Sequence, residues 1–144
     1  MTESDTIKLL RECDEGLKMG VASIDEVLDY VKDEAFKKKL IACKDKHEKL
    51  KSEIQEALDD YNDDGKEPNP IAKGMSWVKT NVKLVINESD KTIADLMTEG
   101  CNMGVKSLNK YLNQYKEASE KAKDITKDII KIEEKLVTDI KQYL

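Results

Sequence analysis

The stretch that decides the fold is GLKMGVASIDEVLDYV, residues 16–31, because it recurs 84 residues later as GCNMGVKSLNKYLNQY, residues 100–115. Both copies begin Gly-x-x-Met-Gly-Val-x-Ser, and both carry leucine at the same later position, Leu28 and Leu112. Four of the six glycines in the chain belong to these copies. A repeat of this kind predicts two similar halves related by a pseudo-two-fold axis.

The composition predicts one all-helical domain, residues 1–144. A chain of 144 residues is long enough to bury a core of its own. Charged residues make up 38% of the chain and aromatic residues only 5%, with two prolines and six glycines. These proportions are typical of long amphipathic helices.

The charge and the cysteines restrict the partners and the environment. All but one of the 25 basic residues are lysines, and the net charge is −5, which disfavours nucleic acid and anionic membranes as partners. We see no apolar run of the roughly 20 residues that a membrane span requires, and no signal peptide. The three cysteines, Cys13, Cys43 and Cys101, are an odd number without the spacing of a disulfide framework, so we expect a cytoplasmic protein.

The helix signals predict two helical hairpins, residues 4–62 and residues 89–144. In the first hairpin, Ser4 and Asp33 are expected to cap the two helices, and the first helix continues to about residue 32. The hairpins pack as a four-helix bundle with one long crossover between them.

In the second hairpin, Ser89 or Asp90 begins one helix and Ser119 begins the other.

The helical spacing also predicts which residues face the core. The helix that follows Asp33 should turn these residues inward: Phe36, Leu40, Cys43, His47, Leu50, Ile54, Ala57 and Tyr61. The helix that follows Ser119 should do the same with Ile125, Ile129, Ile132, Leu136, Ile140 and Leu144.

The crossover, residues 63–88, is expected to carry an additional short helix that begins at Asn69 and Pro70 and ends near residue 87. Its apolar arc is wider than one buried stripe needs, and the surplus is mainly Trp77 and Leu84. These two residues could form a homodimer interface, or Trp77 could lap the edge of the bundle.

The glycines of the repeat, Gly16, Gly20, Gly100 and Gly104, lie inside the expected first and third helices. Each glycine costs a helix about 1 kcal/mol relative to alanine, so four of them require a reason. Close packing of the two helices at the pseudo-two-fold axis is one interpretation. A ligand resting against the exposed backbone is the other.

With this layout, the chain resembles the ferritin-like superfamily, in particular its small families of unknown function built on a duplicated helical hairpin. The resemblance covers nearly the whole chain: a hairpin, a crossover that carries Met75-Ser76-Trp77, and a second hairpin. Its specific element is the paired Gly-x-x-Met-Gly-Val-x-Ser.

The resemblance implies a two-metal site with one inward Glu on the first and third helices and Glu-x-x-His on the second and fourth. This chain departs from that pattern. His47 is its only histidine, and Lys44 stands where the motif requires Glu. Glu15 and Glu99 fall on the outer faces of their helices, so we do not expect an intact di-iron carboxylate site.

Two polar residues stand where the helical spacing calls for apolar ones. His47 falls near the centre of the apolar stripe of the second helix, and Glu133 falls within roughly 30° of the stripe of the fourth. They lie about 14 and 16 residues past their hairpin turns, and antiparallel packing sets them at similar height. We infer that His47 and Glu133 face one another near the middle of the bundle.

One interpretation of the pair is a buried hydrogen-bonded remnant of an ancestral site. The other adds Cys43, one turn before His47, and Cys101 on the third helix to make a metal site. Thiolate, imidazole and carboxylate together suit zinc or another borderline-soft divalent ion. A fourth ligand would have to come from Glu48 or Asp14.

The sequence therefore predicts a non-catalytic ferritin-like bundle with a degenerate metal site and a structural or partner-binding role, with no cofactor. The alternative is a metal-binding or redox-responsive bundle that uses His47, Glu133, Cys43 and Cys101. An enzyme is disfavoured, because the chain shows no nucleophile–base pair, no phosphate-binding glycine loop and no dinucleotide fingerprint.

Overall fold

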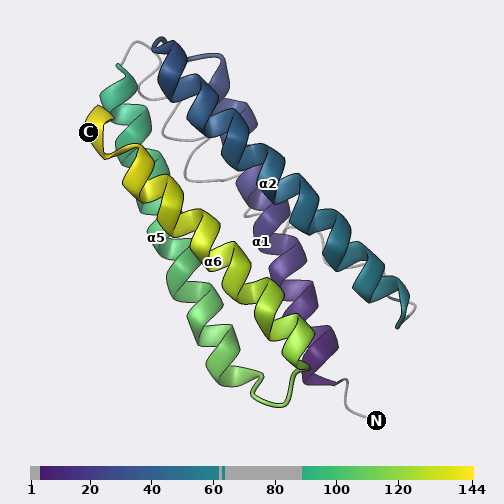
Figure 1. Cartoon of the computed structure of the whole chain (residues 1–144). Helices are drawn as coiled ribbons and strands as arrows, with labels where there is room; N and C mark the ends of the chain where they lie inside the picture. Colours follow the sequence, from purple (N-terminus) through teal and green to yellow (C-terminus); the bar gives the residue numbers. More distant parts are fainter. Residues whose placement is uncertain (1–3, 62, 64–88) are drawn as a thin grey trace.

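The computed structural model describes residues 4–61, 63 and 89–144, and these residues form a bundle of four long α-helices with no β-strand (Figure 1). The elements are α1 (Asp5–Leu28), α2 (Glu34–Asp59), α5 (Asp90–Gln114), α6 (Glu120–Asp139) and a closing 3-10 turn, η1 (Lys141–Tyr143). The predicted all-α bundle is confirmed for this part of the chain.

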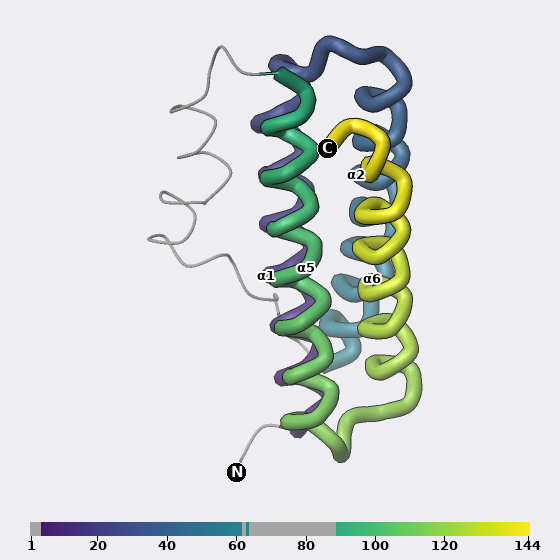
Figure 2. The backbone as a smooth tube through the Cα atoms, turned by 90° about the vertical axis from the view of Figure 1, so that its left-hand side faces the viewer, coloured from purple at the N-terminus to yellow at the C-terminus, as the bar shows by residue number. Residues whose placement is uncertain are grey.

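The helices are arranged as two antiparallel hairpins that pack side by side. Within the hairpins, α1 packs on α2 and α5 on α6; between them, α2 lies against α6, and α1 against α5 and α6. The end of α2 and the start of α5 lie at opposite ends of the bundle (Figure 2). The short helix predicted near residues 70–87, with Trp77 and Leu84, lies outside the described residues.

Three of the helices begin with the side-chain caps expected from the sequence. Ser4, Asp33 and Ser119 each accept a hydrogen bond from the backbone N–H three residues ahead, at 3.3, 2.9 and 3.2 Å. These bonds satisfy N–H groups that the first turn of a helix leaves without partners. Ser89 precedes α5 without a side-chain cap.

The side chain of Asp90 instead joins the two hairpins. Its carboxylate oxygens accept hydrogen bonds from the backbone N–H groups of Lys32 and Asp33, both at 2.8 Å, in the turn between α1 and α2. At the other end, Asp5 accepts the N–H of Glu117, in the turn between α5 and α6, at 3.0 Å. The first helical residue of each hairpin thus accepts hydrogen bonds from the turn of the other hairpin. These bonds set the position of the two hairpins relative to each other along the bundle axis.

The apolar core is divided into two clusters by a layer at mid-height. The cluster near the α1–α2 turn contains Ile24, Val27, Val31, Phe36, Leu40, Cys43, Ile93, Ala94, Leu96, Met97, Cys101, Leu136 and Ile140. The cluster near the α5–α6 turn contains Leu9, Leu10, Cys13, Leu17, Leu50, Ile54, Ala57, Leu58, Leu108, Ala118, Ala122, Ile125 and Ile129. Each helix contributes one residue between them: Gly20, His47, Gly104 and Glu133, which we call the central layer.

Some boundaries differ from the sequence predictions. The first helix ends at Leu28 rather than near residue 32, because the chain turns there and sends Val31 into the core. Tyr61 and Leu144, predicted to face inward, are 46% and 51% exposed. Both follow the last residue of their helix, so the helical stripe no longer directs them toward a neighbour.

The buried arc of α1 is wide, because α1 contacts all three other helices. Leu9 and Leu10 are both buried as a result. Asp14 is also fully buried, and its carboxylate lies 2.7 Å from the ammonium group of Lys18 one turn later. The sequence analysis offered Asp14 only as a flanking metal ligand, whereas the structure pairs it with a lysine.

Candidate functional site

The contact predicted between His47 and Glu133 is present at the centre of the bundle. The imidazole Nε2 lies 3.0 Å from Glu133 Oε1, and the two side chains are only 2% and 12% exposed. His47 comes from α2 and Glu133 from α6, which are neighbours. The interaction therefore links the second helices of the two hairpins.

The other ring nitrogen of His47 fixes the protonation of the pair. Nδ1 lies 2.8 Å from the carbonyl oxygen of Cys43, which can only accept, so Nδ1 carries a proton and donates it. Nε2 faces a carboxylate and donates as well. Burial lowers the pKa of His47, but hydrogen bonds to the Cys43 side chain and to Glu133, together with the electrostatic effect of both residues, raise it more, to about 10. His47 and Glu133 thus form an imidazolium–carboxylate ion pair at neutral pH.

The remaining members of the central layer are glycines that face this pair. A Cβ atom on Gly20 would lie 2.8 Å from Cδ2 and 2.9 Å from Nε2 of His47, which is closer than real Cβ atoms approach. A Cβ atom on Gly104 would lie 3.6 Å from Glu133 Oε2, in ordinary contact. The imidazole therefore occupies the place where a side chain of α1 would stand, and only glycine fits there without movement.

The two hairpins place these residues equivalently. His47 and Glu133 are 86 residues apart, and the same separation relates Asp33 and Ser119, the caps of α2 and α6. Each hairpin therefore sets one polar side chain of its second helix against a glycine from the repeat on its first helix. The central layer is the point where the two polar side chains meet.

Burial holds the thiols of Cys13 and Cys101 protonated. Cys101 is buried and hydrogen-bonded to Glu133. Burial, together with the negative charge of Glu133, raises the pKa of its thiol far above the ordinary range. Cys13 lies 3.2 Å from the Thr126 hydroxyl, and burial raises its pKa to about 12. The Cys43 sulfur lies 3.6 Å from Nδ1 of His47. All three are free cysteines.

The four predicted metal ligands, His47, Glu133, Cys43 and Cys101, lie near one another. Among residues 4–61, 63 and 89–144, no three His, Cys, Asp or Glu side chains are placed so that they could hold a metal ion. His47 donates through both ring nitrogens, and a metal ligand requires one of them as a lone pair.

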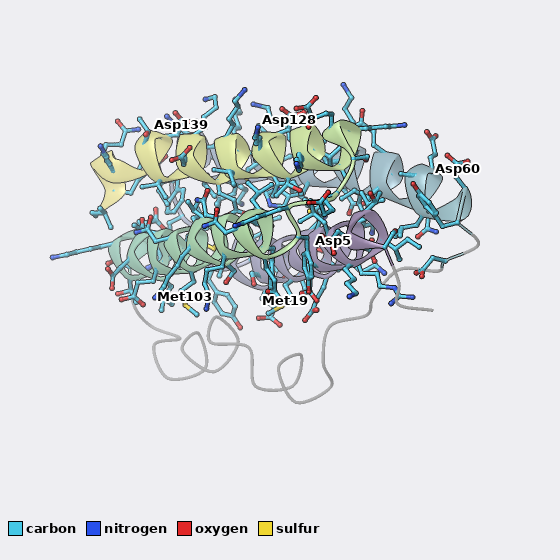
Figure 3. All side chains as sticks on the ribbon, turned by 90° about the horizontal axis from the view of Figure 1, so that it is seen from below. Asp5, Met19, Asp60, Met103, Asp128 and Asp139 are labelled. Carbon is cyan, nitrogen blue, oxygen red and sulfur yellow. The ribbon has the colours of Figure 1, made fainter. Side chains whose placement is uncertain are left out.

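A cavity of about 230 Å³ opens beside the central layer, between α1 and α5. All four glycines of the repeat line it, and His47 and Glu133 form its floor. A Cβ atom on Gly16 would meet no atom of the described residues within 4 Å. Met19 of α1 and Met103 of α5, which also line it, lie on the same face of the bundle (Figure 3).

The glycines thus differ from the close-packing prediction. The atoms nearest to a Cβ on Gly20 or Gly104 are in side chains of α2 and α6 rather than in the backbone of the facing helix, and a Cβ on Gly16 has no atom of the described residues within 4 Å. The other interpretation of the glycines, room for a ligand against the backbone, agrees with the cavity that they line. The sequence analysis missed Tyr111, Glu12 and Glu15 as cavity-lining residues, because these lie outside the apolar stripes.

Comparison with known proteins gives no further guide to this site. No protein-family model, no curated protein and no solved structure matches the chain. In the described part of the chain, no helix is both long and apolar enough to span a bilayer. The role of the site has to follow from its own geometry.

Alanine at Gly16 and at Gly20 should have opposite effects on stability. Gly16→Ala should raise the free energy of unfolding by up to about 1 kcal/mol, because alanine favours the helix and its Cβ meets nothing. Gly20→Ala should lower it by about 1–2 kcal/mol, because the new methyl group displaces the buried His47 ring. Urea unfolding of the two variants tests this, and two changes of the same sign would contradict it.

The ion pair should make stability depend on pH between the ordinary pKa of histidine, 6.5, and about 10. Below pH 6.5 both the folded and the unfolded chain hold the His47 proton, so its full contribution is present. As the pH rises toward 10, the unfolded chain loses the proton first, and the free energy of unfolding should fall by roughly 2–5 kcal/mol. His47→Gln, which cannot titrate, removes this term and leaves the other groups unchanged. The test compares the free energy of unfolding of the two proteins between pH 6.5 and 10. An equal change with pH in both proteins would refute the ion pair.

Proposed function

We propose that this protein is a non-catalytic, ferritin-like bundle that binds a small, largely apolar molecule in the cavity between α1 and α5. The observation that carries the proposal is the cavity of about 230 Å³ whose walls contain the four glycines of the repeat. Glycine weakens a helix, and at Gly16 no atom of the described residues within 4 Å would obstruct a side chain. Space for a ligand accounts for a glycine that the packing of the described residues does not require.

The shape and chemistry of the cavity support a small ligand. An apolar cavity of about 150 Å³ is enough to hold benzene, so this one accommodates a benzene-sized ring with a short chain. Its inner walls are apolar and come from both core clusters: Ile24, Met97, Leu108, Ile129 and Leu136. A predominantly apolar wall with a few polar groups is typical of small-molecule sites.

The metal-binding alternative uses His47, Glu133, Cys43 and Cys101 and has weaker support. The thiol of Cys101 is held protonated and both nitrogens of His47 are donors, whereas metal ligands have to be deprotonated. A metal would therefore have to displace the proton of the Cys101 thiol and one proton of His47, and the hydrogen bonds of the layer would have to rearrange.

Binding can be tested with three phenyl compounds of the same shape: 3-phenylpropylamine, 3-phenylpropan-1-ol and 3-phenylpropionate. In protein labelled with ¹³C at the methionine methyl groups, we expect at least one of them to shift the signals of Met19, Met97 and Met103 saturably, because these residues line the cavity. Gly16→Leu should weaken that binding at least about tenfold by placing a side chain in the open space. Ala22→Leu, an exposed position on the same helix outside the lining, is the matched control. Absence of any saturable shift at millimolar probe would refute the proposal.

Elemental analysis of protein purified without added metal or chelator decides between the two candidates. We expect far less than one metal ion per chain, because the layer offers protonated rather than ligating groups. Near-stoichiometric metal that is lost in His47→Ala would instead favour the metal-binding alternative.

A further inference from the structure

We propose that a groove between α2 and α6 binds a small polyanion made of linked phosphate groups. The groove has a volume of about 330 Å³, and its two helices lie on the side of the bundle opposite to α1 and α5 (Figure 2). It is a second site, so the inference does not depend on a ligand in the cavity between α1 and α5. We call it the lysine groove, after the lysines among its lining residues: Lys38, Lys39, Lys46 and Lys135.

The lysine groove carries an excess of positive charge. The one acidic residue among its described lining residues, Asp139, is already paired, because its carboxylate lies 2.6 Å from the ammonium group of Lys135. In the part of the chain that the structure describes, no carboxylate forms an ion pair with Lys38, Lys39 or Lys46. Three positive charges therefore share the groove without a paired carboxylate.

Both walls of the groove supply lysines. Lys39 and Lys46 are seven residues, or about two helical turns, apart, so they leave the same face of α2. Lys135 reaches the groove from α6, on the other wall. Each ammonium group ends a flexible four-carbon side chain, so the lysines can close on an anion that lies between the two helices.

The floor of the groove is apolar. It contains Cys43 and Leu136, which are only 6% and 3% exposed, and the half-buried Ile132. A cleft that combines charges of one sign with a low-dielectric wall focuses the field of those charges and concentrates ions of the opposite sign. An anion in the groove would therefore be attracted more strongly than an anion beside a flat surface with the same lysines.

The charged groups favour a short phosphate chain over other anions. Lysine offers a compact point charge rather than the planar fork with which arginine binds carboxylates, and no arginine is among the described lining residues. Three lysines without a paired carboxylate match several linked phosphates better than a single one. The net charge of −5 disfavours an extended polyanion such as nucleic acid, whereas a short chain lies within the groove.

Calorimetric titration with sodium tripolyphosphate in metal-free buffer tests the site. We expect saturable binding with a Kd below about 100 μM, and at least about tenfold weaker binding of citrate and of inorganic phosphate. The affinity should fall as the salt concentration rises, because Lys38, Lys46 and Lys135 are exposed. No saturable binding of tripolyphosphate at about 1 mM would overturn the proposal. Equal affinity for citrate would overturn the assignment to phosphate.

The double variant Lys39→Gln/Lys46→Gln locates the anion. Glutamine removes the two charges and favours a helix about as well as lysine, so the bundle should fold, and the affinity for tripolyphosphate should fall at least about tenfold. Lys106→Gln/Lys110→Gln removes the same charge from exposed positions of α5 outside the lining and should have little effect.

An equal loss in the two double variants would mean that the anion responds only to the net charge of the protein. The lysines of the groove would then be solvated groups whose side-chain stems cover the apolar floor, and the proposal would be overturned. An unchanged affinity in Lys39→Gln/Lys46→Gln would overturn it as well. Neither result bears on the binding function proposed for the cavity between α1 and α5, because the phenyl compounds test that cavity separately.

Discussion

The ion pair between His47 and Glu133 determines which groups can pack in the middle of the bundle. A charge in an apolar interior is tolerated only when it is paired and hydrogen-bonded, so the imidazole is held from both sides, by the Cys43 carbonyl and by the Glu133 carboxylate. A ring held in this way leaves no room for a side chain on α1 at Gly20. The pair thereby divides the apolar core into two clusters and requires glycine at position 20 of α1.

The cavity lies at the same level as this pair. Glycine costs a helix about 1 kcal/mol, and a buried ion pair contributes little net stability compared with apolar packing. Both costs fall in the central layer, while the clusters on either side are packed with aliphatic side chains and supply the stability. Natural sequences concentrate such departures from optimal packing at functional sites, which agrees with a binding role for this layer.

The buried thiols fit the same picture. Burial keeps Cys13 and Cys101 protonated, so they act as small apolar groups with weak hydrogen bonds to Thr126 and Glu133. Thiols of this kind are poor nucleophiles and poor metal ligands. Cys101 thus places a neutral thiol beside the ion pair.

The sequence by itself determined the helices, their caps at Ser4, Asp33 and Ser119, most of the buried positions, and the meeting of His47 with Glu133. These follow from helical periodicity and from equal counting along two antiparallel hairpins, which are local properties of the chain. Only the tertiary structure decided that the glycines face side chains and a cavity, that Asp14 is buried, and that His47 donates from both nitrogens. Those features depend on how far α1 stands from α5 and on which atoms fill the space between them, and no pattern within a single helix encodes that distance.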